Sequence, residues 1–467
     1  MRRLTKILAL SARIALPTLP KLPAFLALLA TFILPPRAGA QSRALDDYVA
    51  LGLKQNLGLR QAAVAADRSE AIVREARGNF LPSATLNARY TDFRGNGVDF
   101  GQFINPVFST LNQLTGTNQF PTNVNVKLPL KQETSVRLAQ PVFQPAIIAG
   151  YRAASAARDA QDATRDAATF NVAAEIRSAY LQHAKARRLS ELRAATRFLL
   201  EEQVRVMSRL IEAGRATPDA LSRARAELSE ALQLQAEAAQ LADASAHAFN
   251  LMLARQLTDS VVIDGDTLGF GAMPSLDAAI AGAAERRAEL RALSAAARAA
   301  LAQKRVVQSA FLPNLSVALD YGVQGNEYRF SSDADYTALS VVASWNLFNG
   351  GRTAARAEQA GLDARRLALQ GDEAKRGVEL QVRLAWQAAE VARQAIATAE
   401  DQRSAAARTH ELVRRRAEEG LASPLELSQA RTQLTAAELN AVFTTYDYYL
   451  RRVELDRAAA LYPRATR

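Results

Sequence analysis

The chain has no cysteine, only three histidines and few aromatic residues, which make up 6% of its 467 residues. Without cysteine there can be no disulfide framework, no thiolate metal site and no lipidated cysteine. His183, His247 and His410 are far apart in the sequence, and none has a second ligand at metal-binding spacing. The Gly-x-Ser-x-Gly motif of serine hydrolases is also missing. We therefore predict that the protein is not an enzyme and holds no metal or cofactor.

Long apolar runs are equally scarce. The one clear run, residues 22–34, follows a basic stretch and precedes the small residues Ala38, Gly39 and Ala40. It is too short to span a bilayer, and this order is typical of a secretory signal peptide, which we place at residues 1–40. A buried N-terminal helix is the alternative, but the run lacks helical periodicity. No later segment has the pattern of a transmembrane helix, so insertion into a membrane would have to use β-strands.

The formal net charge of +11 does not indicate nucleic-acid binding. Six bases lie in residues 1–40, which contain no acid, so +5 remains for the rest of the chain (11 − 6). There the bases alternate with acids, as on solvated helix faces. Much of the hydrophobic content is alanine, the best helix former. This composition predicts long, closely packed helices rather than a deep globular core.

The sequence contains two copies of one unit. The tripeptide Phe80-Leu81-Pro82 recurs 231 residues later as Phe311-Leu312-Pro313, and the segment 214–218 recurs 206 residues later as 420–424. Several such matches in one order indicate an internal repeat. We place the first copy at residues 41–260, a linker at 261–274 and the second copy at 275–462. The shrinking offset puts a 26-residue expansion within residues 91–133.

Each copy predicts the same order of elements. A helix of about 36 residues leads to the Phe-Leu-Pro break, and two strands with a loop follow it. Next come proline-free runs of 68 residues, at 146–213 and 352–419. As single helices these runs would each be roughly 100 Å long. A Gly-x-x-[Ser/Thr]-Pro turn and a shorter helix complete the copy, so that two short helices can stack end to end beside one long helix and form a rod.

The strands alternate between apolar and polar residues. Leu315, Val317 and Leu319 alternate with Ser316, Ala318 and Asp320, and a return strand runs to Leu347. This pattern suits a transmembrane β-barrel, although the face of a soluble sandwich is an open alternative. Four strands per chain are too few to close a barrel and leave two open edges. Closure therefore predicts a symmetric oligomer of two, three or four copies.

Three of these motifs resemble those of the TolC family of outer-membrane efflux proteins. They are the Phe-Leu-Pro breaks, the strand exit 345–351 (WNLFNGG) and the paired turns, of which the second reads EGLASPLELSQA over residues 419–430. The resemblance covers residues 44–461. It implies an α+β membrane protein with an internal two-fold repeat. Three chains would form a homotrimer with a twelve-stranded β-barrel, continuous with a periplasmic α-barrel of twelve helices.

The resemblance also implies a function. Such a protein is the exit duct of a tripartite efflux or type I secretion system and lies in the outer membrane of a Gram-negative bacterium, with its helical part in the periplasm. Its partners would be a periplasmic adaptor and an inner-membrane pump of the resistance-nodulation-division, ABC or major-facilitator type. Small molecules such as drugs would pass to the exterior without any bond being broken. The alternatives are a periplasmic coiled-coil adaptor and a non-conducting helical scaffold.

The two predicted turns are the main candidate sites. Glycine favours the position just past a helix C-terminus, and Ser or Thr followed by Pro favours a helix start. Both signals mark a purely structural turn. By the resemblance, the same residues form adaptor-docking tips: Gly214, Thr217, Pro218, Gly420, Ser423 and Pro424.

The resemblance also implies a periplasmic gate at the second turn. Glu426 matches an acidic gate position, although Ser423 and Glu426 equally form a helix-capping box. The family's second acidic position is Gln429 here, and its aromatic partner is Ala417. In the first turn, Arg215 and Asp219 are candidates for a pair between subunits, or for solvated side chains.

Two further regions complete the prediction. Residues 95–132, rich in Gly, Asn, Thr and Pro, resemble an extracellular loop over the mouth of the barrel. The junctions between barrel and tunnel are expected at Phe80, Pro82, Phe143, Phe311, Pro313 and Phe348.

Overall fold

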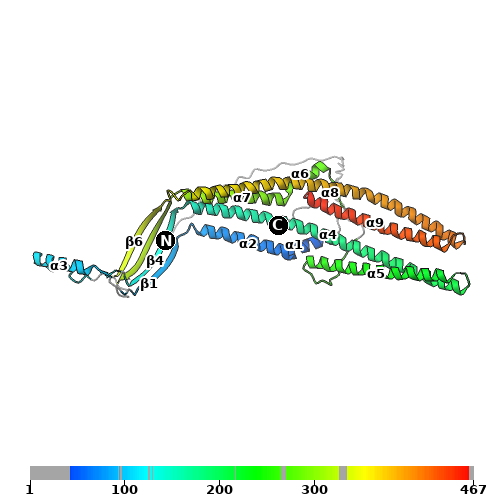
Figure 1. Ribbon diagram of the computed structural model, residues 1–467, viewed down its shortest axis with the longest axis horizontal. Helices are drawn as coiled ribbons and strands as arrows, with labels where there is room; N and C mark the ends of the chain where they lie inside the picture. Colours follow the sequence, from blue (N-terminus) through cyan, green and yellow to red (C-terminus); the bar gives the residue numbers. More distant parts are fainter. Residues whose placement is uncertain are drawn as a thin grey trace, which may run out of the picture.

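The protein is a long rod with a small sheet near one end (Figure 1). The computed structural model describes residues 43–461 except 93, 95–96, 125–126, 129, 216, 265–269 and 326–333. The predicted signal peptide, residues 1–40, lies outside the described residues, and so does part of the predicted linker. Among the described residues, no helix is both long enough and apolar enough to cross a membrane.

Two long helices run along the rod. They are α4 (Pro145–Glu212, 68 residues) and α8 (Arg352–Glu418, 67 residues), as the two proline-free runs predict. Each turns back at the far end into a shorter helix, α5 (Pro218–Met252) or α9 (Pro424–Ala458). We call α4 with α5 the first hairpin and α8 with α9 the second hairpin.

Small buried residues at seven-residue spacing hold these helices together. This spacing keeps one seam facing a neighbouring helix, and alanine lets the backbones approach closely. On α8 the seam comprises Ala357, Ala364, Val378, Ala385, Ala392 and Ala399, and on α5 it comprises Ala224, Ala231 and Ala238.

The helix that begins each copy is broken, so the prediction of one helix of about 36 residues is wrong. The first copy has α1 (Arg43–Gln55) and α2 (Leu57–Gly78), and the second has α6 (Leu276–Arg286) and α7 (Ala288–Gln308). In the first copy, Asn56 separates α1 from α2 and caps α2. Its side-chain oxygen accepts from the Leu59 N–H, and its side-chain N–H donates to the Met252 carbonyl. Arg287, 231 residues later, has the same extended backbone. Its buried guanidinium donates to Gln381 at 2.7 Å.

The short helices stack end to end along the long ones, as predicted. In the first copy α2 and α5 both pack on α4, and in the second α7 and α9 both pack on α8. The largest buried side chains gather at mid-rod, where α1, α4 and the end of α5 meet: Ile176, Tyr180, Phe249 and Leu253.

The sheet consists of four antiparallel strands in the order β1-β4-β5-β6. Their bounds are Ser83–Tyr90, Gln132–Phe143, Asn314–Gly325 and Asp335–Ser344. β1 and β6 are the edges. The return strand stops at Ser344, short of the predicted Leu347, and the indole of the next residue, Trp345, donates to the Phe311 carbonyl at 3.0 Å.

The two faces of the sheet differ, as the alternation predicts. Leu138, Leu319 and Leu339 are register partners across β4, β5 and β6, and all three side chains are exposed on one face. On the opposite face Arg137 of β4 pairs with Asp320 of β5 at 2.7 Å. One face is therefore apolar and the other polar.

The predicted loop at residues 95–132 contains a helix, which is a correction. Between the short strands β2 (Val98–Asp99) and β3 (Lys127–Leu128) lies α3 (Gly101–Thr115). Its Phe, Ile, Val and Leu residues recur at helical spacing, a signal that the surrounding Gly, Asn and Thr residues hide. Figure 1 shows α3 beyond the sheet, at the end of the molecule opposite to the hairpin turns.

Candidate functional site: the helical tips and the sheet junction

Both hairpins end in the same glycine turn. Gly214 has φ +69° and Gly420 has φ +77°, the left-handed conformation that other residues adopt at a cost. The next N–H reaches back to the long helix in each case, Arg215 to Leu210 and Leu421 to Arg416, both at 2.7 Å. This is the Schellman arrangement, which satisfies the last carbonyl groups of the helix. The predicted helix ends are therefore confirmed.

The return helices begin as predicted, but their caps differ. Thr217 and Ser423 are the N-cap residues, with Pro218 and Pro424 at the first helical position. Only the Ser423 hydroxyl accepts a bond from its own helix, from the Glu426 N–H at 3.2 Å. In the first turn the Thr217 hydroxyl bonds instead to the Asp219 carboxylate and lowers the pKa of Asp219.

Glu426, the candidate gate carboxylate, bonds within its own turn. It accepts from the Ser423 hydroxyl at 3.3 Å and lies 4.0 Å from the Arg416 guanidinium. Arg416 also donates to the Leu421 carbonyl at 3.1 Å, so it fastens the turn from the other side. The Ser423 hydroxyl caps α9 as the capping box predicts, whereas the Glu426 carboxylate bonds to that hydroxyl and not to the Ser423 N–H that a full capping box would use.

The other gate candidates stay apart within one chain. Gln429, Arg215 and Asp219 are all exposed. Within the described residues no ion pair joins Arg215 to Asp219.

A charged cluster lies on the last turns of α8. Glu411 pairs with Arg414 and Arg415 at 2.9 Å, and Arg414 also pairs with Glu418. The two guanidinium groups lower the pKa of Glu411 to about 2. The positive charges of Arg414 and Arg415 are therefore balanced by acids on the same helix.

One contact near the tips escapes sequence reasoning. Glu227 of α5 accepts from Arg431 of α9 at 2.6 Å and from the Ser428 hydroxyl at 2.9 Å. This ion pair and hydrogen bond connect the first hairpin to the second. The charged side chains are mostly covered, with exposed fractions of 26% for Glu227 and 17% for Arg431. A cavity of about 220 Å³ between α4, α5 and α9 lies beside them.

The acid of this contact has no counterpart in the other copy of the repeat. Ser428 and Arg431 correspond to Ser222 and Arg225 of the first copy, at the 206-residue offset. The residue that corresponds to Glu227 is Gln433, which has no charge. A comparison of charges at the 206-residue offset would have shown that Glu227 has no acidic counterpart, but not that Arg431 is its partner.

The junctions combine turns with exposed aromatic side chains. The Phe80 ring meets Tyr151 edge to face at 6.0 Å, and the Phe80 carbonyl accepts from Gln140 at 3.0 Å. Phe143, Phe311 and Phe348 are exposed. Pro82 and Pro313 lie where each helix gives way to its strand, as the break motif predicts.

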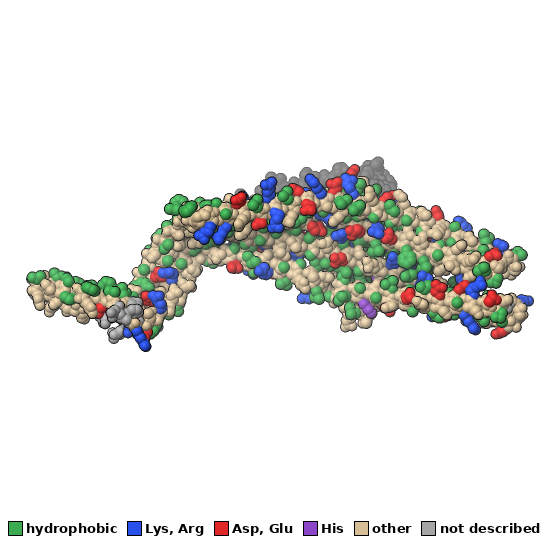
Figure 2. Space-filling view, viewed as in Figure 1, with side chains coloured by type: hydrophobic (Ala, Val, Ile, Leu, Met, Phe, Trp, Pro, Cys, Tyr) green, Lys and Arg blue, Asp and Glu red, His purple; other side chains and the backbone are tan. Residues whose placement is uncertain are grey.

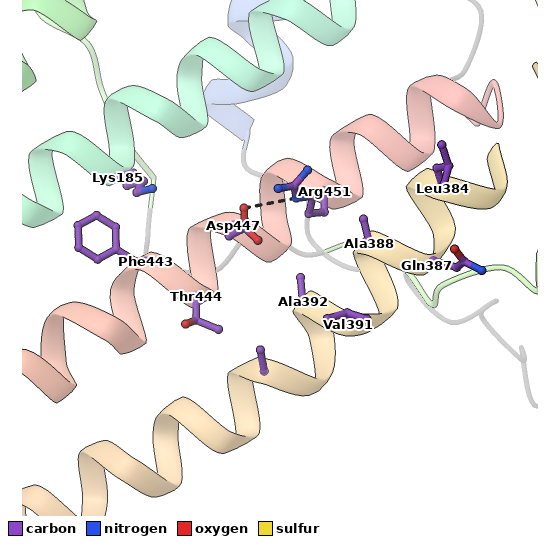
Figure 3. A pocket seen from close by; sticks show the side chains of 11 residues that line it. Lys185, Leu384, Gln387, Ala388, Val391, Ala392, Phe443, Thr444, Asp447 and Arg451 are labelled. Carbon is purple, nitrogen blue, oxygen red and sulfur yellow. Dashed lines mark ion pairs between the residues drawn. The ribbon is translucent and has the colours of Figure 1, made fainter. Parts of the chain in front are cut away.

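A groove of about 740 Å³ runs between α8 and α9 (Figure 3). Its walls are mostly apolar and include the exposed Leu384 and Val391. On its rim the Lys185 ammonium lies 4.7 Å from the centre of the Phe443 ring, and Arg451 pairs with Asp447 at 3.4 Å. One chain therefore leaves part of the apolar surface of α8 uncovered.

Solved structures share this architecture. The outer-membrane channel OprN matches with a TM-score of 0.72 at 18% identity, over 90% of both chains. The outer membrane channel CmeC of Campylobacter jejuni matches with a TM-score of 0.73 at 16% identity, over 89% of this chain and 85% of that one. The open state of the MtrE channel of Neisseria gonorrhoeae matches with a TM-score of 0.69 at 19% identity, over 90% of both.

Sequence comparison points to the same group of proteins. No curated protein sequence matches the chain. The family profile described as outer membrane efflux protein matches residues 279–461, which is most of the second copy. The resemblance drawn from the motifs is thus confirmed: residues 279–461 match the outer membrane efflux protein family, and the chain as a whole has the fold of the outer-membrane channels.

Proposed function

We propose that the protein is the exit duct of a tripartite efflux or type I secretion system, with its sheet in the outer membrane of a Gram-negative bacterium and its helices in the periplasm. The observation that carries this proposal is the joining of two parts. A two-faced sheet with open edges continues directly into a rod of helices about 100 Å long. One chain can form only part of the wall of a channel, so several copies are needed to enclose a pore.

Closure of the sheet requires a symmetric oligomer, for which we propose the homotrimer that the family resemblance implies. In a bilayer the edge strands β1 and β6 need partners, and the β6 edge of one copy can pair with the β1 edge of the next. Three copies of four strands give a barrel of twelve. The apolar face, with Leu138 and Leu339, then meets lipid, and the polar face, with Arg137 and Asp320, lines the lumen.

The helices fit the same assembly. Each chain supplies four helical lanes, two long helices and two stacked pairs, so three copies give a tunnel of twelve lanes. The apolar groove that contains Leu384 and Val391 is a surface for a neighbouring copy. Each copy of the internal repeat would supply two adjacent lanes, one long helix and one stacked pair.

The tips are proposed as the docking and gating end. Gly214, Thr217 and Pro218 in one turn, and Gly420, Ser423 and Pro424 in the other, form two similar surfaces at the end farthest from the sheet (Figure 1). A periplasmic adaptor, coupled to an inner-membrane pump, would bind them.

The gate residues are Glu426, Gln429, Arg215 and Asp219, which are exposed in one chain and would line the narrowed tip in the assembly. The contact between Glu227 and Arg431 restrains the two hairpins from separating.

The cargo is proposed to be small toxic molecules, including drugs. The MtrE channel of Neisseria gonorrhoeae has an open state, and an open and a closed form of this protein would differ at the tips. The alternatives, a periplasmic adaptor or a helical scaffold, fit less well because the strands are interleaved with the helices in both copies.

The test is fractionation followed by deletion. The protein should be found in outer membranes and should migrate as a heat-sensitive trimer on gels. Deletion of the gene should increase sensitivity to a panel of toxic compounds, and the wild-type gene should restore resistance. A soluble monomer, or unchanged sensitivity to every compound, would contradict the proposal.

A further inference from the structure

The helix α3 in the outer loop is held in a defined position. Asn105 bonds to both backbone groups of Val124, donating at 3.0 Å and accepting at 2.8 Å. Asn112 does the same with Phe120, at 2.7 and 3.0 Å. The Phe108 and Phe120 rings pack with their centres 5.6 Å apart. One side of α3 is thereby fixed against the returning chain, so the opposite side is presented in a constant orientation.

The opposite side of α3 is apolar and exposed to solvent in one chain. Phe103, Val107 and Leu114 follow one another at intervals of four and seven residues, which places them in one stripe along the helix. Their exposed fractions are 69%, 56% and 78%. Figure 2 shows apolar side chains predominating over α3, whereas charged ones are scattered along the helical rod. A helix that is held in a fixed orientation and exposes an apolar stripe is typical of an interaction surface.

The charge of the loop narrows the choice of partner. Between Arg94 and Lys127 the sequence has one charged residue, Asp99, whose carboxylate accepts from the Gly101 N–H at 2.9 Å. Helices that lie on anionic membrane surfaces carry Lys and Arg on their polar face, and α3 has none. A charged protein partner would find no complementary group. The surface fits another uncharged apolar stripe.

In a symmetric assembly, the α3 of a neighbouring copy would provide such a stripe. The loop begins at β1, the edge strand that the proposed trimer pairs with a neighbouring copy, and it lies beyond the sheet at the outer end of the rod (Figure 1). Rotational symmetry then brings one α3 from each copy to the same end of the barrel. We infer that the α3 helices of neighbouring copies pack stripe to stripe through Phe103, Val107 and Leu114 and form an apolar closure over the outer mouth. This inference rests on the proposed symmetric channel.

The absence of cysteine makes a direct test possible, because each introduced cysteine is the only one in the chain. Val107→Cys places a thiol in the stripe. Ser109→Cys, two residues on, places it on the opposite side of the same helix, where it is also exposed. A disulfide forms only when the two Cα atoms lie within about 7 Å. Both full-length variants are purified in detergent, checked for particle mass and oxidised.

The expected result for Val107→Cys is a disulfide-linked dimer band on non-reducing denaturing gels that holds up to two of every three chains, because a disulfide joins only two of the three thiols of a trimer. Ser109→Cys should remain wholly monomeric on the same gels. A trimeric particle in which the two variants crosslink equally, or neither does, overturns the packing of α3 and leaves the channel proposal intact. Labelling of Val107→Cys on intact cells by a membrane-impermeant maleimide, as fast as Ser109→Cys, overturns it as well. A monomeric particle overturns both proposals.

Discussion

Glu227 and Arg431 are 204 residues apart in the sequence, yet their side chains meet at 2.6 Å and connect the two hairpins near their tips. The Ser428 hydroxyl adds a second bond to the same carboxylate. Because the groups are mostly covered, solvent and salt screen the pair less than they screen an exposed one. The position of one hairpin relative to the other is therefore fixed in part by a single charged contact.

Glu227→Gln should loosen the tips. We expect hydrogen exchange in the tip-proximal turns of α5 and α9 to become roughly fivefold faster, which corresponds to a loss of about 1 kcal/mol. Exchange measured by mass spectrometry checks this. Glu230→Gln is the matched control, because Glu230 lines the same cavity and forms no ion pair within the described residues. If Glu227→Gln and Glu230→Gln change exchange equally, the contact does not restrain the hairpins.

Gly420→Trp should abolish drug resistance while trimers still assemble. The indole would occupy the surface proposed for the adaptor, and a Cβ at Gly420 meets nothing within 4 Å inside the chain. Susceptibility of a deletion strain that carries the variant gives the readout. Because φ is +77° at this position, Gly420→Ala controls for the backbone strain.

A second control separates docking from bulk. Gly78→Trp adds the same side chain at an open, exposed position at the end of α2, far from the tips. We expect both Gly420→Ala and Gly78→Trp to retain resistance. Normal resistance in Gly420→Trp would remove the docking role of the second tip.

Ala254→Gly should stabilise the protein. Ala254 follows the end of α5 with φ +53°, in the left-handed region, and its N–H bonds to the Leu251 carbonyl at 3.1 Å. Alanine costs roughly 1 kcal/mol more than glycine in this conformation. The melting temperature should rise, and Ala254→Val should lower it. Ala460, 206 residues later, has the same φ, so Ala460→Gly should act in the same direction. Unchanged melting in both glycine variants would contradict the strain.

Acid should weaken the middle of the rod through His183. This buried imidazole lies 2.9 Å from the Ser245 hydroxyl, which itself donates to the Ala242 carbonyl. Burial is the main cause that lowers the pKa of His183 below 6.5. The unfolded chain therefore takes up a proton first as the pH falls, so stability is full above pH 6.5 and declines below it.

Melting temperatures at pH 7.5 and pH 5 measure this effect. His183→Gln should reduce the difference between the two values, whereas His247→Gln, at an exposed position, should leave it unchanged. The same pH difference in wild type and His183→Gln would show that another group is responsible.

The parts of the fold that sequence predicted depend on local chemistry. Proline-free runs and a glycine followed by Ser-Pro or Thr-Pro locate α4, α8 and the tips within a residue or two, because each signal acts on its own neighbours. The breaks at Asn56 and Arg287 were missed because both residues are tolerated within helices. At Asn56 the local cap on the Leu59 N–H acts together with a bond to the distant Met252, and at Arg287 the extended backbone is accompanied by a bond to the distant Gln381.

The candidate site likewise contains some features that follow from local sequence and others that do not. The caps at Ser423 and the glycine turns follow from three or four adjacent residues. The pairing of Glu227 with Arg431 depends on how two hairpins lie side by side, which no local pattern encodes. Helix α3 lies between these cases, because its stripe is present in the sequence but is diluted by turn-forming residues.

The seams of alanine at seven-residue spacing along the helices have one more consequence. Away from the mid-rod cluster of larger buried side chains, methyl groups hold neighbouring helices together with few side-chain atoms, so most larger residues there lie on one surface of the rod or the other. Substitutions on the inside or the outside of the wall then leave the packing between helices intact. Such a wall can acquire new surface chemistry, for a different cargo or partner, while its length and diameter stay the same.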